Sequence, residues 1–231
     1  MKNVFYLYFF LIVVISSLLV NSSNNNIVVV NNKKIIPVVK EIDNSYDYYR
    51  NLYSNKDIIG SIRIDNYFDV LFVKTTDNSF YLNHNLSKEY DILGSVFLDY
   101  RTNFPDKKIL IYGHNFKYNK TAFGELEKYL DYSFYKDNKF IIIDTDLYEI
   151  KYEIFSVYLT KDDYEYFDVD IFDYEKHYNN LINNSLYNTN VTINKLDNIL
   201  VLQTCSDKYK DYFVIVCAKE IEKRKKWKIS Y

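Results

Sequence analysis

Short apolar runs rich in β-forming residues recur along most of this chain and constrain its fold more than any other feature. Polar turn residues separate them, and we expect each to form a strand. The runs span residues 58–64, 68–74, 94–100, 108–114, 139–145, 148–159, 198–205 and 212–219. About eight short strands in one domain predict a mostly β barrel or sandwich. Polar and apolar residues alternate over 149–154, which is typical of a strand with one face in water.

Helical spacing of apolar residues appears in three places between these runs. It predicts an amphipathic helix over 40–56, before the first strand, and helical insertions over 121–137 and 173–187. The chain has 231 residues, of which 48% are hydrophobic. This is enough for one domain with a substantial core and a short appendage.

The N-terminal appendage begins with an apolar stretch over 4–20, which follows Lys2 and contains only two serines as polar residues. Seventeen helical residues span about 26 Å, close to the ~30 Å of a bilayer core. We therefore predict an uncleaved membrane anchor over 1–22, a polar tether over 23–39 and a soluble domain over 40–231. A cleaved signal peptide is the alternative. Lys2 predicts a single-pass protein of the cell membrane with its domain outside the cell.

The charge pattern excludes some kinds of partner. The net charge is −2, so no general basic field favours nucleic acid. The basic segment 223–228 is interpreted as a solvated chain end, with a phosphate- or lipid-facing patch as the lesser alternative. No phosphate-binding glycine loop and no zinc-type Cys/His spacing occurs in the sequence. We expect no metal and no cofactor.

The two cysteines, Cys205 and Cys217, are predicted to be free thiols. If the last two apolar runs form a hairpin, the cysteines lie about 13 Å apart along it. A disulfide requires Cα atoms within about 7 Å. Cys217 lies within an apolar run and is interpreted as a small core residue. Cys205 ends a predicted strand, where a side chain can be accessible.

Three histidines are available to assist a thiol. His84 and His177 are interpreted as surface residues, whereas His114 ends an apolar run directly after Gly113. Strand ends of a barrel bring side chains to a shared rim, so His114 and Cys205 can meet there. A cysteine nucleophile needs thiolate character and a nearby proton carrier, which this pair supplies. The alternative is an inert strand-end cysteine and a structural histidine.

Several blocks of the sequence occur in the order found in one known family. They are "DIIGSIRI" (57–64), "DNSFYLNHN" (77–85), "GSVFLDYR" (94–101), the segment 109–138 that begins "ILIYGHN", and "LQTC" (202–205). With the helical insertion at 173–187, they resemble a class B sortase over about residues 40–221.

The resemblance implies a closed β-barrel of about eight strands and an extracellular cysteine transpeptidase. Such an enzyme cleaves a C-terminal sorting motif of a secreted protein at a Thr–x bond. It then transfers the acyl group to an amine of a cell-wall precursor or a surface protein such as a pilin. The resemblance makes Cys205 the nucleophile and His114 the general acid/base, with Thr204 shaping the substrate site.

One position departs from the family pattern. Sortases place an arginine at the start of the strand after the cysteine, where it contacts the substrate and the developing oxyanion. Here Phe213 occupies that position, and no arginine occurs between Arg101 and Arg224. Three alternatives stay open: Lys208 or Lys210 supplies the charge, backbone N–H groups act alone, or the protein is a peptide-binding module that turns over poorly.

A second, milder departure is Gln203, where class B members often carry serine. We expect its side chain to point away from the thiol of Cys205, by the alternation of a strand.

Overall fold

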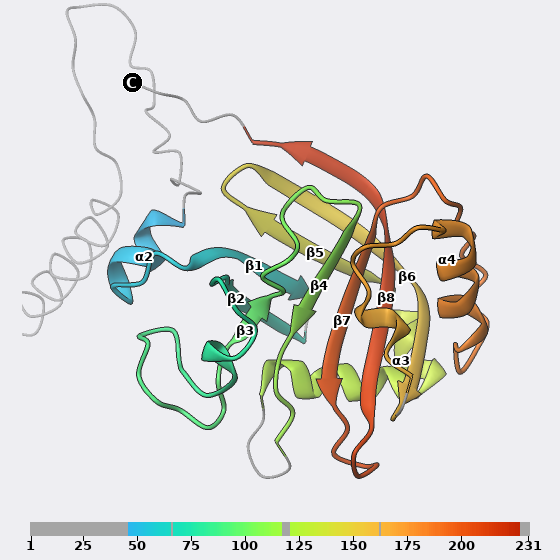
Figure 1. Cartoon of the computed structure of the whole chain (residues 1–231), viewed down its shortest axis with the longest axis horizontal. Coiled ribbons are helices and arrows are strands. Elements are labelled where there is room, and N and C mark those ends of the chain that lie inside the picture. Colours follow the sequence, from blue (N-terminus) through green and yellow to red (C-terminus); the bar gives the residue numbers. More distant parts are fainter. Residues whose placement is uncertain (1–45, 66, 117–120, 162, 227–231) are drawn as a thin grey trace, which may run out of the picture. The chain divides into compact units, whose positions relative to one another are not determined.

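The computed structural model describes residues 46–226 apart from 66, 117–120 and 162, and within them eight strands close into a barrel (Figure 1). The strands are β1 (Ile58–Ile64), β2 (Phe68–Val73), β3 (Val96–Leu98), β4 (Lys108–Tyr112), β5 (Phe140–Thr145), β6 (Tyr148–Thr160), β7 (Ile199–Cys205) and β8 (Phe213–Lys225). Their order around the barrel is β1-β2-β3-β4-β7-β8-β6-β5, and β5 pairs with β1. Two neighbouring pairs, β2/β3 and β4/β7, are parallel and the others antiparallel. The predicted mostly β fold is confirmed, and it is a closed barrel rather than a sandwich.

The helical segments are shorter than the sequence predicts. Of the helix expected over 40–56, the described part is α2 (Asp47–Leu52), and residues 40–45 lie outside the described residues. The stretch 121–137 divides at the extended residue Asp131 into a 3-10 helix, η2 (Ala122–Leu130), and α3 (Tyr132–Asp137). The insertion at 173–187 contains α4 (Tyr174–Asn183), which begins where the carboxylate of Asp173 accepts a hydrogen bond from the backbone of Lys176. Two further 3-10 turns are η1 (Phe80–Leu82) and η3 (Glu165–Phe167).

The strands β3 and β8 differ most from the predicted runs. β3 is limited to three residues, and Gly94 before it has a φ of 59°, in the left-handed region that favours glycine. β8 runs six residues beyond the predicted end at 219, because its charged half pairs with β6. There Arg224 forms an ion pair with Glu149 of β6 at 2.5 Å. Part of the basic segment 223–228 is therefore strand rather than a loose chain end.

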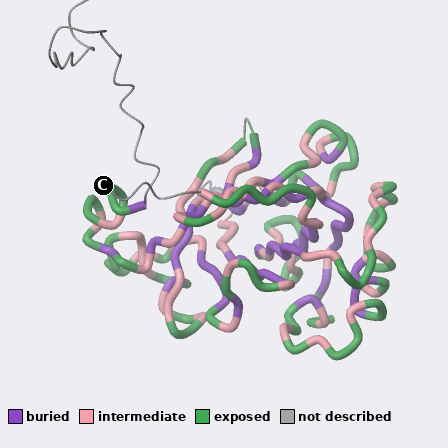
Figure 2. Tube along the Cα trace, turned by 90° about the horizontal axis from the view of Figure 1, so that it is seen from above, coloured by how far each residue is buried: buried purple, intermediate pink, exposed green. Residues whose placement is uncertain are grey.

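Apolar side chains form two clusters on opposite faces of the β4-β7-β8 part of the barrel wall. The interior cluster receives alternate residues from all eight strands, such as Ile109 of β4 and Leu200 of β7. The outer cluster includes Leu110, Val201 and Leu181, the last from α4. Figure 2 shows buried residues along the strands and exposed residues along the outer loops. Because both faces are covered here, these strands appear in the sequence as continuous apolar runs.

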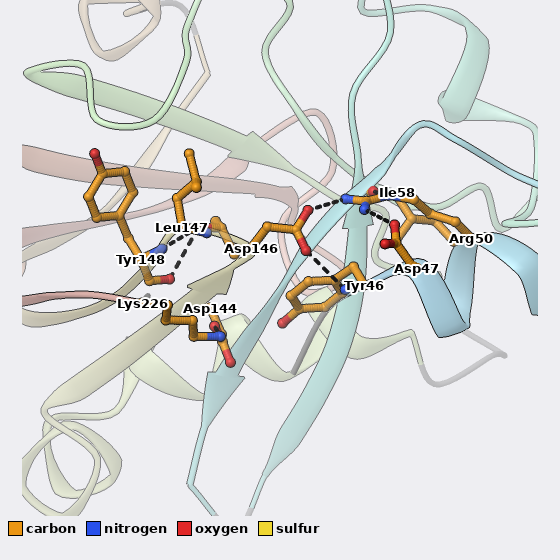
Figure 3. Close-up of polar contacts among 10 residues, drawn as sticks. Tyr46, Asp47, Arg50, Ile58, Asp144, Asp146, Leu147, Tyr148 and Lys226 are labelled. Carbon is orange, nitrogen blue, oxygen red and sulfur yellow. Dashed lines mark hydrogen bonds and ion pairs between the residues drawn. The ribbon is translucent and has the colours of Figure 1, made fainter. Parts of the chain in front are cut away.

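Helix α2 is fixed to the barrel by hydrogen bonds from Tyr46 and Arg50. Asp146, in the turn between β5 and β6, accepts a hydrogen bond from the backbone N–H of Tyr46 at 3.0 Å and from Arg50 at 2.6 Å. Arg50 also donates to the carbonyl of Ile58 at 2.8 Å (Figure 3). The chain therefore enters β1 from a fixed direction.

Within the part of the chain that the structure describes, no helix is long and apolar enough to cross a membrane. The predicted anchor over 1–22 and tether over 23–39 lie outside the described residues.

Candidate active site

His114 and Cys205 lie at the matching ends of two paired strands. β4 and β7 are parallel, Tyr112 pairs with Gln203, and the N–H of Gly113 donates to the carbonyl of Gln203 at 3.2 Å. His114 and Cys205 each follow this pair by two residues. Neighbouring strands lie about 4.8 Å apart, so the register brings the two residues side by side. Both line one cavity of about 240 Å³.

The backbone around His114 is fixed by the segment that follows it. A Cβ at Gly113 would lie 2.6 Å from the ring of Phe123, so only glycine allows this close approach. The hydroxyl of Thr121 donates to the carbonyl of His114 and accepts from the N–H of Gly124, which caps η2. The start of η2 therefore holds His114 at the cavity.

The ring of His114 has a defined hydrogen-bond partner. Its Nε2 lies 2.6 Å from the carbonyl oxygen of Leu82. Because a carbonyl only accepts, Nε2 carries a proton in this arrangement. In the neutral ring, Nδ1 is then the nitrogen that can accept a proton.

Cys205 is a free and exposed cysteine at the last position of β7. It belongs to the cavity with His114 and to a second cavity of about 440 Å³. Neighbouring protein atoms partly desolvate the thiol and raise its pKa, so the neutral form is favoured at rest. Phe213 pairs directly with Cys205 across the hairpin and lines both cavities. His114, Cys205 and Phe213 are called the rim site below.

One carboxylate connects the segments that follow His114 and Cys205. Glu127 of η2 accepts hydrogen bonds from Asn115 at 3.1 Å, from the hydroxyl of Ser206 at 2.6 Å and from the N–H of Lys208 at 2.9 Å. Partial burial alone would raise the pKa of Glu127, but these hydrogen bonds outweigh it and keep the pKa below its ordinary value. Glu127 therefore fixes both ends of the rim site relative to each other.

Another carboxylate, which is buried, supports the wall of the cavity that contains His114. Asp99 accepts hydrogen bonds from Arg101 at 2.7 Å and from Tyr112 at 2.7 Å. Burial opposes ionisation of Asp99, yet the bonds from Arg101 and Tyr112 lower its pKa. The guanidinium of Arg101 also lies 4.1 Å from the ring centre of Phe167, which lines the cavity. This contact connects the β6–β7 insertion to the β4 side of the site.

The comparison with known proteins identifies the family. A family model described as the sortase domain matches residues 71–221, well over half of the chain. The chain belongs to the sortase family.

Relatives of this sortase are named sortase B, which confirms the resemblance to class B. Sortase B of Listeria monocytogenes serovar 1/2a is 38% identical over 121 residues, covering 50% of this chain and 48% of that protein. The chain thus spans about half the length of the curated relatives it matches. The crystal structure of Clostridium perfringens sortase B is 32% identical with a TM-score of 0.71, covering 77% of this chain and all of that one. A Staphylococcus aureus sortase B–substrate complex is 28% identical with a TM-score of 0.69, covering 77% and 84%.

The structure corrects the expected orientation of Gln203 in this sortase. Gln203 and Cys205 are two residues apart in β7, so alternation places their side chains on the same face. Gln203 lines the cavity with His114 and accepts a hydrogen bond from the hydroxyl of Tyr166 at 3.1 Å. The prediction that it points away from the thiol was wrong, because it miscounted the strand period.

Thr204 lies on the other face of β7. It pairs with Val214, a residue of the interior cluster, and is only 1% exposed. Its side chain lines neither cavity, and its hydroxyl has no hydrogen-bond partner among the described residues. Any contact of Thr204 with a substrate in this conformation therefore involves its backbone.

The basic residues near the thiol differ from the sequence-based candidates. Lys208 and Lys210 are exposed in the β7–β8 turn and line neither cavity at Cys205. Lys161, directly after β6, lines the second cavity with Cys205 and Phe213. No local pattern marks Lys161 in the sequence, because it follows the strand in an acidic loop, 44 positions before the cysteine.

The two other histidines lie away from the rim site. His84 is half-exposed, stacks on Phe80 with ring centres 4.0 Å apart, and lines neither cavity. His177 is 4% exposed, so its assignment to the surface was wrong. It lies beside Tyr178 and Leu181 on α4, within the arc of the helix that packs on the barrel.

His177 belongs to a polar group, called the Lys108 cluster below, which contains Lys108, Glu165, Asp168 and His177. In this group Lys108 and His177 are buried, whereas Glu165 is half-exposed and Asp168 exposed. Lys108 of β4 lies 2.9 Å from Nε2 of His177 and donates to the carbonyl of Asp168 at 2.5 Å. Nδ1 of His177 lies 3.8 Å from the carboxylate of Glu165. Burial lowers the pKa of Lys108 to about 7, and burial with the nearby Lys108 charge lowers the pKa of His177 to about 4. This cluster holds the β6–β7 insertion against β4.

Among the described residues, no three His, Cys, Asp or Glu side chains gather closely enough to hold a metal ion. The absence of a cofactor stays a prediction from the sequence.

Proposed function

We propose that this sortase is a class B cysteine transpeptidase with Cys205 as nucleophile and His114 as general acid/base. The observation that carries the proposal is the parallel β4/β7 register, which brings the two residues to one cavity. The two residues are far apart in the sequence, so only the folded barrel brings them together. A solvent-exposed thiol beside an imidazole is the arrangement that thiol-dependent acyl transfer needs.

The reaction follows from the groups at the rim site. The raised pKa of Cys205 means that the thiol must lose its proton before attack, and Nδ1 of His114 is free to accept it. The sulfur adds to the Thr carbonyl carbon of the sorting motif and forms a tetrahedral oxyanion. Collapse breaks the C–N bond, and the imidazolium returns the proton to the leaving amine. An acceptor amine then attacks the thioacyl carbon and loses a proton to His114. Collapse breaks the C–S bond, and His114 returns the proton to the leaving sulfur, which regenerates the Cys205 thiol.

The proposed donor substrates are secreted proteins with a C-terminal sorting signal. The cavity with His114 is lined largely by aromatic and apolar side chains, including Phe97 and Phe167, and by the amides of Asn78 and Gln203. Such a lining suits a short extended peptide with apolar and hydrogen-bonding side chains. The proposed acceptor is an amine of a peptidoglycan precursor or of a pilin.

We also propose that residues 1–22 anchor the sortase in the cell membrane with its domain outside. The support is the apolar stretch 4–20 that follows Lys2. Deletion of residues 1–39 is expected to move the protein from the membrane fraction to the soluble fraction. Retention of the deleted protein in the membrane fraction would contradict the proposal.

Mass spectrometry of the full chain tests the chemistry. The probe is a mixture of octapeptides with threonine fixed at the fifth position and the other positions varied. A thioacyl adduct on Cys205 is expected, with loss of the segment after threonine. Triglycine should then release the bound segment as an octapeptide that ends in three glycines. Cys205→Ala should form no adduct. Peptide cleavage without involvement of Cys205 would contradict the proposed mechanism.

A peptide-binding module on a sortase barrel is the second candidate function. Phe213 favours it, because an apolar ring directly opposite the nucleophile offers no charge to an oxyanion. Saturable binding of the octapeptides without adduct or cleavage would support the module. Phe213→Arg is then informative: increased turnover would show that the missing cation limits catalysis.

A further inference from the structure

Two cavities meet at Cys205, and the proposed reaction uses only one of them. The first contains His114 and supplies the proton transfers. The second, of about 440 Å³, contains Lys161, Tyr164 and Asp211. Cys205 and Phe213 line both cavities, so these two residues lie where the cavities adjoin. The second cavity therefore opens directly onto the place where an acyl group would bind to sulfur.

The sheet register explains how Lys161 reaches this junction. Thr160, the last residue of β6, pairs with Phe213 of β8, which in turn pairs with Cys205 of β7. Lys161 is thus one residue beyond a row of three side-by-side positions. The backbone of Lys161 therefore lies two strand spacings, or about 10 Å, from the backbone of Cys205. A flexible four-carbon side chain can cover much of that distance past Phe213.

Attack of a thiolate on a carbonyl creates a negative oxygen that needs a positive or hydrogen-bonding partner. Phe213 offers neither. Among the described residues that line the two cavities, Lys161 is the one lysine or arginine. We propose that the ammonium group of Lys161 stabilises the oxyanion formed when Cys205 attacks the substrate carbonyl. This inference rests on the acyl transfer proposed above.

The charge of Lys161 acts on the reacting substrate rather than on the resting thiol. Burial is the cause that raises the pKa of Cys205, and no charge among the described residues contributes to the shift. Asp211 places a carboxylate in the same cavity as Lys161. The ammonium therefore matters most once a substrate oxygen occupies the junction and gains negative charge.

The test compares variants of the full chain by two rates. The first is the rate of thioacyl formation from the octapeptide mixture, measured by mass spectrometry. The second is the rate of Cys205 alkylation by iodoacetamide between pH 6 and 9 (about the range in which thiols titrate). Lys161→Ala should slow thioacyl formation by about 10- to 100-fold, because it removes one oxyanion donor from an open site. Lys161→Arg should keep the rate within about threefold of the original protein, since it retains the charge.

Two further variants sharpen the test. Lys210→Ala removes an exposed lysine of the β7–β8 turn, outside both cavities, and should leave both rates unchanged. Phe213→Arg added to Lys161→Ala should restore thioacyl formation at least about tenfold, by placing a cation opposite Cys205. Alkylation should follow the same pH profile in every variant, because the proposed charge acts only on the substrate oxygen.

The outcomes separate this inference from the proposed function. If the original protein forms the thioacyl adduct and Lys161→Ala forms it as fast as Lys210→Ala does, the proposed role of Lys161 is overturned while acyl transfer stands. If alkylation and thioacyl formation fall together in Lys161→Ala, the lysine maintains the thiol or the fold, and the oxyanion role is overturned. If the original protein forms no adduct although Cys205 is alkylated normally, the acyl transfer itself fails, and this inference fails with it.

Discussion

The rim site and the Lys108 cluster, taken with their neighbours, both bring lysine, histidine and cysteine side chains close together, but the first set is accessible and the second is largely buried. The rim site has a cysteine and a histidine, Lys161 lies in the adjoining cavity, and all three residues line one or both of these cavities. The Lys108 cluster has a lysine and a histidine in direct contact, and Cys217 is buried close enough to interact with the charge of Lys108. Burial raises the pKa of Cys217 to about 12. Residue type alone therefore does not make a reactive thiol. Whether the thiol can be reached by a substrate, and which charged groups lie near it, decide its reactivity.

The largest expected difference between the two regions is in activity. Cys205→Ala should lower peptide cleavage by at least about 10³-fold, since the nucleophile is lost, with little change in the free energy of unfolding. Cys217→Ser should keep cleavage and lower the free energy of unfolding by about 1–3 kcal/mol, because it buries a hydroxyl in an apolar site. Peptide cleavage and urea unfolding of both variants provide the measurement. Equal loss of activity in the two variants would remove the distinction.

The Lys108 cluster should make stability depend on pH. Between about pH 7, the pKa of folded Lys108, and its unfolded pKa near 10.4, the unfolded chain binds more protons than the folded one. The free energy of unfolding should therefore rise with pH in this window, by at most about 1.4 kcal/mol per unit. Lys108→Met should remove this rise, measured by urea unfolding at several pH values. The exposed control Lys208→Met should keep it, and equal slopes in both variants would show that Lys108 does not titrate in this window.

Glu127 should affect the rim site at a distance. Glu127→Gln keeps the size of the side chain but weakens its bonds to Ser206 and Lys208, so thioacyl formation should slow by about tenfold, the rate equivalent of one weakened hydrogen bond. Because the folded pKa of Glu127 is lowered, its stabilisation is present above the unfolded pKa and is lost as pH falls through the folded one. The variant should therefore lose less stability on acidification.

The matched control for this prediction is Glu125→Gln. Glu125 lies on the same 3-10 helix and pairs with Lys128 rather than with the β7–β8 turn. It should leave thioacyl formation unchanged. A similar slowing in both variants would mean that η2 as a whole, rather than the Glu127 contacts, positions the site.

The smallest expected effect concerns Thr204. Its buried hydroxyl has no partner among the described residues, so Thr204→Val should raise the free energy of unfolding by about 1 kcal/mol. Thermal or urea unfolding measures this gain. The KM for the octapeptides should stay constant, since the side chain faces the barrel interior. A lower stability would indicate that the hydroxyl has a partner in solution, and a raised KM would indicate contact with the substrate.

Several features of this sortase were predictable from its residues. The apolar runs gave the strands to within a few residues, except that β8 continues into a charged segment because β6 provides a partner for it. The hairpin geometry predicted that Cys205 and Cys217 stay unpaired, and both are free. The ordered sequence blocks predicted the family, which the sortase-domain match confirms. The roles of His114 and Cys205 stay predictions, supported by their shared cavity.

Other features depended on contacts between distant segments. His177 is buried against Lys108, which lies 69 positions earlier in the sequence. The ring of His177 gives the buried ammonium group of Lys108 a hydrogen-bond acceptor. The position of Lys161 follows from the β6/β8/β7 register, which no local pattern encodes. The sequence by itself determined the strands, their buried faces and the strand-end thiol, because these follow from local periodicity. Only the tertiary structure decided which charges meet that thiol, because side chains from separate strands converge only when the barrel closes.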